Sequence, residues 1–133
     1  MGYSPKIWGK EGWHFIHMVA LNYPFNPDEE TKSKYSEFFH SLKYVLPCEV
    51  CSNNWANKIK ENPPNLKNRE ELFNWTVDMH NSVNLSNKKS SLSYESALRR
   101  LNNKKSNENI KESFFITSAI FISLITIKNI LQK

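Results

Sequence analysis

The sequence predicts an all-α fold, a four-helix bundle with a short fifth helix, followed by a C-terminal hydrophobic helix. Apolar residues recur at helical spacing in several segments, and prolines or capping residues separate these segments. All three glycines lie within the first twelve residues, which leaves few positions for tight hairpin turns. We expect one domain over residues 1–101, a polar basic linker over 102–112 and a hydrophobic segment over 113–131.

Five helices are expected in the domain, and their boundaries follow from caps and prolines. The first begins near Trp8 or Lys10 and stops before the two prolines of the segment 23–27. Asp28, Asn68 and Ser93 are suitable N-caps for the second, fourth and fifth helices, because their side chains accept hydrogen bonds from free helical N–H groups. The expected ranges from the second helix onward are 29–45, 48–61, 69–84 and 94–102.

The net charge of +5 is concentrated in one segment. Residues 1–87 carry nine basic and ten acidic side chains, whereas residues 88–111 carry seven basic and two acidic ones. A basic segment that precedes an apolar tail indicates contact with a membrane or with phosphate groups, not a general nucleic-acid surface. We therefore expect no nucleic-acid partner.

The segment 113–131 is expected to be a transmembrane tail anchor. It has no charged residue before Lys128, and it approaches the length of about twenty residues that a membrane span needs if Lys128 snorkels. The basic flank on its N-terminal side would hold the folded domain on the cytosolic face. The alternative is a sixth helix that packs into a soluble core.

Cys48 and Cys51 are the only two cysteines, and they lie three residues apart at the expected start of a helix. A disulfide across two intervening residues closes too short a loop to stabilise a fold by much. The pair is therefore a redox centre, half of a metal site, or two buried thiols. Zinc would need two further ligands, and the four histidines do not have a standard finger spacing.

Two further pairs share a helix face at a spacing of four residues. Trp13 and His17 could clamp a flat heteroaromatic ligand, although both could equally be ordinary core aromatics. His80 and Asn84 form a polar face, which is also common at a helix C-terminus. Neither pair identifies a ligand by itself.

Lys88 and Lys89 follow this polar face and could meet a pyrophosphate, although such a pair is often simply solvated. A centre of two cysteines needs an acceptor for two electrons. Combined with the aromatic, histidine and basic residues, this requirement points to a flavin.

Three motifs in order resemble the Erv/ALR family of FAD-linked sulfhydryl oxidases, particularly its short viral members. They are WGKEGWHFIH at 8–17, followed by Tyr23-Pro24; PCEVC at 47–51; and HNSVN at 80–84. Together these motifs cover residues 8 to about 100. The resemblance implies the four-helix bundle with a short fifth helix, and noncovalent FAD at its mouth.

The activity that the resemblance implies is oxidation of protein thiols to disulfides. Electrons would pass from Cys48 and Cys51 through FAD to O2, which becomes H2O2. Cys51 resembles the proximal thiol that faces the flavin, and Cys48 the distal thiol that meets the substrate. We therefore expect Cys51 to be the more buried of the two and to face His80 and Trp13.

The resemblance also implies which residues bind FAD, and they come from the three motifs and the basic pair after them. These residues are Gly9, Lys10, Trp13, His17, Tyr23, Cys51, His80, Asn81, Val83, Asn84, Lys88 and Lys89.

The expected partners are a thiol-containing protein substrate, O2, the membrane and a second copy of the chain in a homodimer. The short viral members suggest a thioredoxin-like or CxxC relay protein as substrate, and a virion or host-cell membrane as location. Two alternatives from other classes are a zinc-binding helical membrane adaptor and a dithiol carrier without its own flavin.

Overall fold

The computed structural model describes residues 2–103, 106–107, 109 and 111, and no strand occurs among them. They fall into two units, one ending at Tyr94 and one beginning at Glu95. The first unit contains the helices α1 (Pro5–Leu21), α2 (Glu29–Val45), α3 (Glu49–Glu61) and α4 (Arg69–Ser86). Residues 94–103 are also helical, which confirms the fifth helix expected at 94–102.

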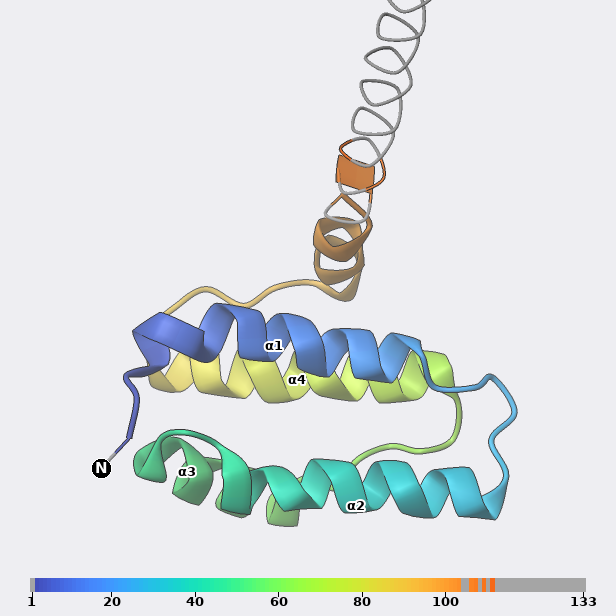
Figure 1. Ribbon diagram of the computed structural model, residues 1–133, viewed down its shortest axis with the longest axis horizontal. Coiled ribbons are helices and arrows are strands. Elements are labelled where there is room, and N and C mark those ends of the chain that lie inside the picture. Colours follow the sequence, from blue (N-terminus) through green and yellow to red (C-terminus); the bar gives the residue numbers. More distant parts are fainter. Residues whose placement is uncertain (1, 104–105, 108, 110, 112–133) are drawn as a thin grey trace, which may run out of the picture. The chain divides into compact units, whose positions relative to one another are not determined.

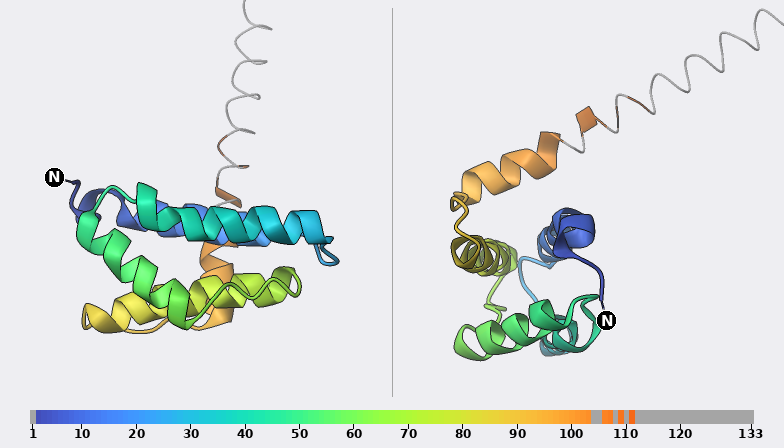
Figure 2. Two further views of the ribbon diagram at one scale, coloured as in Figure 1. Left: turned by 90° about the horizontal axis from the view of Figure 1, so that it is seen from below. Right: turned by 90° about the vertical axis from the view of Figure 1, so that its left-hand side faces the viewer.

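The four helices of the first unit pack in two pairs. α1 lies antiparallel beside α4, and α2 lies beside α3 (Figures 1 and 2). Aromatic side chains connect the pairs through the core, where the ring of Phe39 on α2 packs against Trp75 on α4 with centroids 4.9 Å apart. Within the α2–α3 pair, the indole N–H of Trp55 donates to the Phe39 carbonyl at 2.8 Å. The indole N–H of Trp75 donates to the Asn62 carbonyl at 3.0 Å, which ties α4 to the end of α3. These bonds satisfy the polar edge of each buried ring.

The predicted caps are confirmed at two helices. Asp28 accepts a hydrogen bond from the Thr31 amide at 2.7 Å, and Asn68 accepts one from the Glu71 amide at 2.9 Å. Both are bonds from a side chain to the backbone three residues later, and such bonds are readable from sequence because they depend on local chemistry alone.

The predicted start of α1 was wrong, because this helix begins at Pro5 and not near Trp8 or Lys10. Ser4 is its N-cap and accepts a hydrogen bond from the Lys6 amide at 3.3 Å. Proline suits the first helical position, where its missing N–H would have no intrahelical partner.

The expected membrane anchor at 113–131 lies outside the described residues. Within the part of the chain that the structure describes, no helix has the length and apolar character needed to cross a membrane.

Candidate active site

Cys48 and Cys51 are joined as a disulfide at the corner between α2 and α3. Leu46 and Cys48 are both extended, and Pro47 between them prevents α2 from continuing into α3. Cys48 is the N-cap of α3, and its Sγ accepts a hydrogen bond from the Cys51 amide at 3.3 Å. The sulfur of Cys48 therefore lies at the positive end of the helix dipole, which favours a thiolate there.

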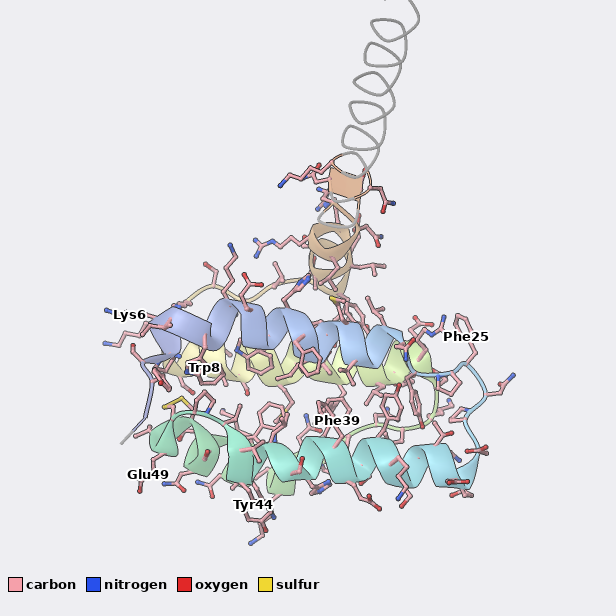
Figure 3. All side chains as sticks on the ribbon, in the orientation of Figure 1. Lys6, Trp8, Phe25, Phe39, Tyr44 and Glu49 are labelled. Carbon is pink, nitrogen blue, oxygen red and sulfur yellow. A yellow bond between two sulfur atoms is a disulfide. The ribbon has the colours of Figure 1, made fainter. Side chains whose placement is uncertain are left out.

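A cleft of about 390 Å³ lies beside the disulfide, between α1, α3 and the C-terminal half of α4. Both cysteines line it, and no charged residue does. Its walls are mostly apolar, and Trp8, Trp13 and Trp55 contribute to them. Figure 3 shows the disulfide next to Trp8, between α1 and α3. An uncharged aromatic cleft of this size suits a flat organic ligand.

The wall formed by Trp13 is backed by two histidines. The rings of Trp13 and His80 are parallel to within 5°, with centroids 4.3 Å apart, and Trp13 also stacks on His17 at 5.9 Å. Trp13 contacts the Trp55 ring on α3 as well, at 5.9 Å. Three helices therefore fix the orientation of this indole.

The two histidines are part of a buried hydrogen-bonded chain. His17 Nδ1 lies 2.8 Å from the Thr76 hydroxyl, and His17 Nε2 lies 3.1 Å from His80 Nδ1. Burial lowers the pKa of His17 from 6.5 to about 3, with smaller contributions from His80 and His14. His17 is consequently neutral at neutral pH.

The two cysteines differ in the space that they face. Cys48 also lines an open hollow of about 840 Å³ on the outside of the corner, together with Tyr3 and Tyr44, whereas Cys51 does not line it. Both cysteines are half-buried, so burial alone does not distinguish them as expected. Cys48 thus connects the outside to the cleft, while Cys51 faces the cleft.

The structure brings some of the expected flavin residues to the cleft and leaves others away from it. Gly9, Trp13, Cys51 and Val83 line the cleft. His17 and His80 lie against Trp13. The remaining expected residues do not line the cleft, and they are Lys10, Tyr23, Asn81, Asn84, Lys88 and Lys89.

Tyr23 lies just beyond the end of α1 that is opposite to Trp8, where it makes contacts within the fold. Its side chain is fully buried, and its hydroxyl donates to the Leu66 carbonyl at 2.9 Å. The Tyr23 carbonyl accepts a hydrogen bond from Arg69, whose guanidinium lies 4.0 Å from the Phe25 ring centroid. Tyr23 therefore connects the α1–α2 turn to the α3–α4 turn.

Asn81 holds the chain that follows α4. Its side-chain amide donates to the Leu92 carbonyl at 2.9 Å, and its carbonyl oxygen accepts from the Leu92 amide at 2.8 Å. Lys88 has a left-handed backbone with φ of 56°, and the Lys89 amide donates to the Asn84 carbonyl at 2.8 Å. The backbone bonds of Lys88 and Lys89 close the C-terminal turn of α4, and the Asn81 bonds hold Leu92 beside the helix.

Sequence reasoning did not assign Trp8, Gly12 and Trp55 to the cleft. Gly9 and Gly12 stand one turn apart inside a helix, where glycine costs about 1 kcal/mol relative to alanine and usually has a packing reason. That spacing could have indicated Gly12. A Cβ on Gly12 would lie 2.9 Å from the Trp8 ring, so glycine lets this ring pack against the helix.

We expect alanine at these two glycines to have opposite consequences. Gly9→Ala adds a methyl group with its nearest neighbour at an ordinary 3.8 Å, so helix propensity should raise the free energy of unfolding by about 0.5–1 kcal/mol. In Gly12→Ala the added methyl group meets the rigid Trp8 ring, so the free energy of unfolding should not rise. Urea unfolding of the flavin-free protein measures both, and an equal gain at both positions would contradict this account.

The described residues contain no group of three or more His, Cys, Asp or Glu side chains placed to hold a metal ion. The site is instead a disulfide at the start of a helix, beside an uncharged aromatic cleft in an all-α bundle. This arrangement defines a small helical dithiol–disulfide redox domain. The chain belongs to the Erv1/Alr family, whose model matches residues 10–113.

Two relatives illustrate the similarity in sequence. A probable FAD-linked sulfhydryl oxidase of Acanthamoeba polyphaga mimivirus is 46% identical over 101 residues, which cover 74% of this chain and 71% of the relative. The mitochondrial FAD-linked sulfhydryl oxidase ERV1 of Saccharomyces cerevisiae is 34% identical over 76 residues, covering 57% of this chain and 40% of the relative. The chain thus matches less than half of the yeast relative's length.

Solved structures of the yeast protein have the same fold. The yeast Erv1 core superimposes with a TM-score of 0.71 at 28% identity, covering 76% of this chain and 86% of the core. The FAD-binding domain of yeast Erv1 gives the same TM-score and identity, and 96% of that domain is covered.

Proposed function

We propose that the chain is a FAD-dependent thiol oxidase that forms protein disulfides and transfers the electrons to O2, producing H2O2. The observation that carries the proposal is the placement of the disulfide, with Cys48 lining both the outer hollow and the cleft and Cys51 lining the cleft. Substrate thiols and a cofactor can therefore reach the same S–S bond from different sides. The named activities of the relatives support the same reaction.

The cleft fits the flat ring system of a flavin, because it is uncharged and bordered by three tryptophans. Gly9, Trp13 and Val83 would hold the ring, with His17 and His80 orienting Trp13. Bound FAD supplies a two-electron acceptor that O2 can reoxidise.

The protein's own part of the reaction is thiol–disulfide exchange. A substrate thiolate attacks Cys48 Sγ, the Cys48–Cys51 bond breaks, and Cys51 leaves as a thiolate. A second substrate thiolate attacks the substrate sulfur of the mixed disulfide, which releases Cys48 and completes the substrate disulfide. The Cys51 amide, 3.3 Å from Cys48 Sγ, favours the thiolate that leaves in this second step.

The purified protein is expected to be yellow and to consume oxygen when dithiothreitol is added. Absorbance and an oxygen electrode measure these properties, and about one H2O2 should form per disulfide by the two-electron stoichiometry. A colourless, well-folded protein would contradict the proposal. Stoichiometric zinc without flavin would favour the adaptor, and disulfide exchange without oxygen consumption would favour the dithiol carrier.

A homodimer fits the surface of α1. Ile7, Phe15 and Met18 lie on one side of this helix and are 73%, 56% and 50% exposed. Large apolar side chains gathered on one exposed face are typical of an interface. Sedimentation of the detergent-solubilised protein should give twice the mass of the 15.6 kDa chain, and a monomer at micromolar concentration would reject the dimer.

The membrane anchor at 113–131 would hold the domain at the cytosolic face of a virion or host-cell membrane. Its support is the uncharged apolar sequence behind the basic segment. The full chain should stay with membranes in alkaline carbonate, and a chain ending at residue 111 should not. Extraction of the full chain by carbonate would reject the anchor.

The substrate would be a small thioredoxin-like or CxxC relay protein, as the resemblance to the short viral members suggests, and its thiol would reach Cys48 from the open outer hollow. In the Cys51→Ser variant the Cys48 thiolate can attack the disulfide of an oxidised partner, and the mixed disulfide that forms cannot be displaced by residue 51. Mass spectrometry of the trapped species identifies the partner. Trapping of bulk glutathione alone would reject a dedicated relay.

A further inference from the structure

The hydroxyl of Thr76 can donate its hydrogen to only one of its two neighbours. The side chain is fully buried in α4, and its Oγ1 lies 2.7 Å from the carbonyl oxygen of Phe73. A carbonyl oxygen can only accept, so the hydroxyl donates to it, as threonine often does within a helix. Toward His17 the hydroxyl oxygen is then only an acceptor.

His17 must therefore carry a hydrogen on Nδ1, which lies 2.8 Å from that oxygen. Its burial keeps the ring neutral, with a pKa of about 3, so it carries only this one hydrogen near pH 7. The other nitrogen, Nε2, is left as an acceptor. It faces His80 Nδ1 at 3.1 Å, so that nitrogen must be the donor.

We propose that Thr76 is a positioning residue that sets the direction of a hydrogen-bonded chain from His80 through His17 and Thr76 to the Phe73 carbonyl. The chain places a hydrogen on His80 Nδ1, directed at His17 Nε2. Thr76 acts on His80 through His17 and does not itself line the cleft.

The consequence for the active site follows from the stacking of His80 on Trp13 at 4.3 Å. Because the Nδ1 hydrogen of His80 is donated to His17, the His80 ring has a fixed charge distribution where it stacks on Trp13. The Trp13 indole forms the wall of the cleft. Any effect of this chain on a bound flavin rests on the proposed function. The placement of the hydrogens does not rest on it, because that placement follows from the protein's own donors and acceptors.

Nitrogen-15 NMR of the histidine rings in the full-length, detergent-solubilised protein at pH 7 tests the proposal directly. In the unmodified protein, His17 should show a hydrogen-bearing Nδ1 and a bare Nε2, and His80 should show a hydrogen-bearing Nδ1. A His80 without a hydrogen on Nδ1 would overturn the proposal without any mutation.

Thr76→Val removes the acceptor for His17 and should invert the chain. The hydrogen of His17 should move to Nε2 and donate to His80 Nδ1, which should lose its hydrogen. Thr76→Ser keeps the hydroxyl and should keep the original pattern. A folded Thr76→Val protein with unchanged histidine nitrogens would overturn the proposal, whatever its oxygen consumption.

Discussion

Replacing Cys51 by serine is expected to abolish thiol oxidation while flavin stays bound. Serine cannot form the S–S bond that the substrate thiolate attacks, so turnover with dithiothreitol should fall by at least about 10³-fold, the scale for removal of a covalent nucleophile. The hydroxyl is smaller than the thiol and Cys51 is one member of a large cleft lining, so the shape of the cleft is kept. Oxygen consumption and visible absorbance measure the two properties separately.

Ala56→Ser is the matched control, because it places the same side chain on α3, at a position that does not line the cleft. It should retain both flavin and turnover. Loss of flavin from Cys51→Ser would instead mean that the thiol holds the cofactor. Continued oxygen consumption with dithiothreitol in Cys51→Ser would contradict the assignment of the redox centre.

Local chemistry explains why most of the fold could be predicted. Asp28 and Asn68 cap their helices through bonds that span three residues, and Pro47 breaks the chain at the disulfide corner. Ser4 and Pro5 carry an equally local signal for the start of α1. The predicted start instead followed the apolar spacing, whose first member is Trp8.

The cleft was predictable only in part, because its contacts join distant segments. Helical spacing placed Trp13 and His17 on one face, and the family motifs grouped them with His80, but periodicity alone cannot show that α1 and α4 lie side by side. Thr76 reads as a member of an apolar stripe. Its role depends on a hydrogen bond to His17, 59 residues away in sequence.

Tyr23 was grouped with the flavin residues by its motif, and the structure places it outside the lining of the cleft, so its role at the cofactor stays a prediction. It lies close in sequence to the ring-packing residues, but the length of α1 carries it to the far end of the bundle from Gly9 and Trp13. Its hydroxyl is already bonded to the Leu66 carbonyl.

Acid should destabilise the protein through His17 over a defined pH range. The unfolded chain binds a proton at this residue below pH 6.5, whereas burial lowers the pKa to about 3 in the folded state, with His80 and His14 adding to the effect. The unfolded state thus binds more protons between these values, and the free energy of unfolding falls as the pH falls. His17 alone should contribute up to about 1.4 kcal/mol per pH unit in this range and nothing above it.

Urea unfolding of the full-length protein between pH 8 and pH 4.5 measures this slope. His17→Gln should reduce it, because glutamine does not titrate, even if the lost packing lowers stability at every pH. His40→Gln is the control, since His40 lies on α2 and its Nδ1 contacts the Ser36 carbonyl at 2.8 Å, apart from the chain of Thr76 and His80. The Asp28 carboxyl, whose pKa is lowered by hydrogen bonds from Thr31, becomes important only at lower pH, below 3.8. If His17→Gln and His40→Gln have the same slope, His17 is not held neutral, and the hydrogen-bond direction inferred for the Thr76 chain loses its support.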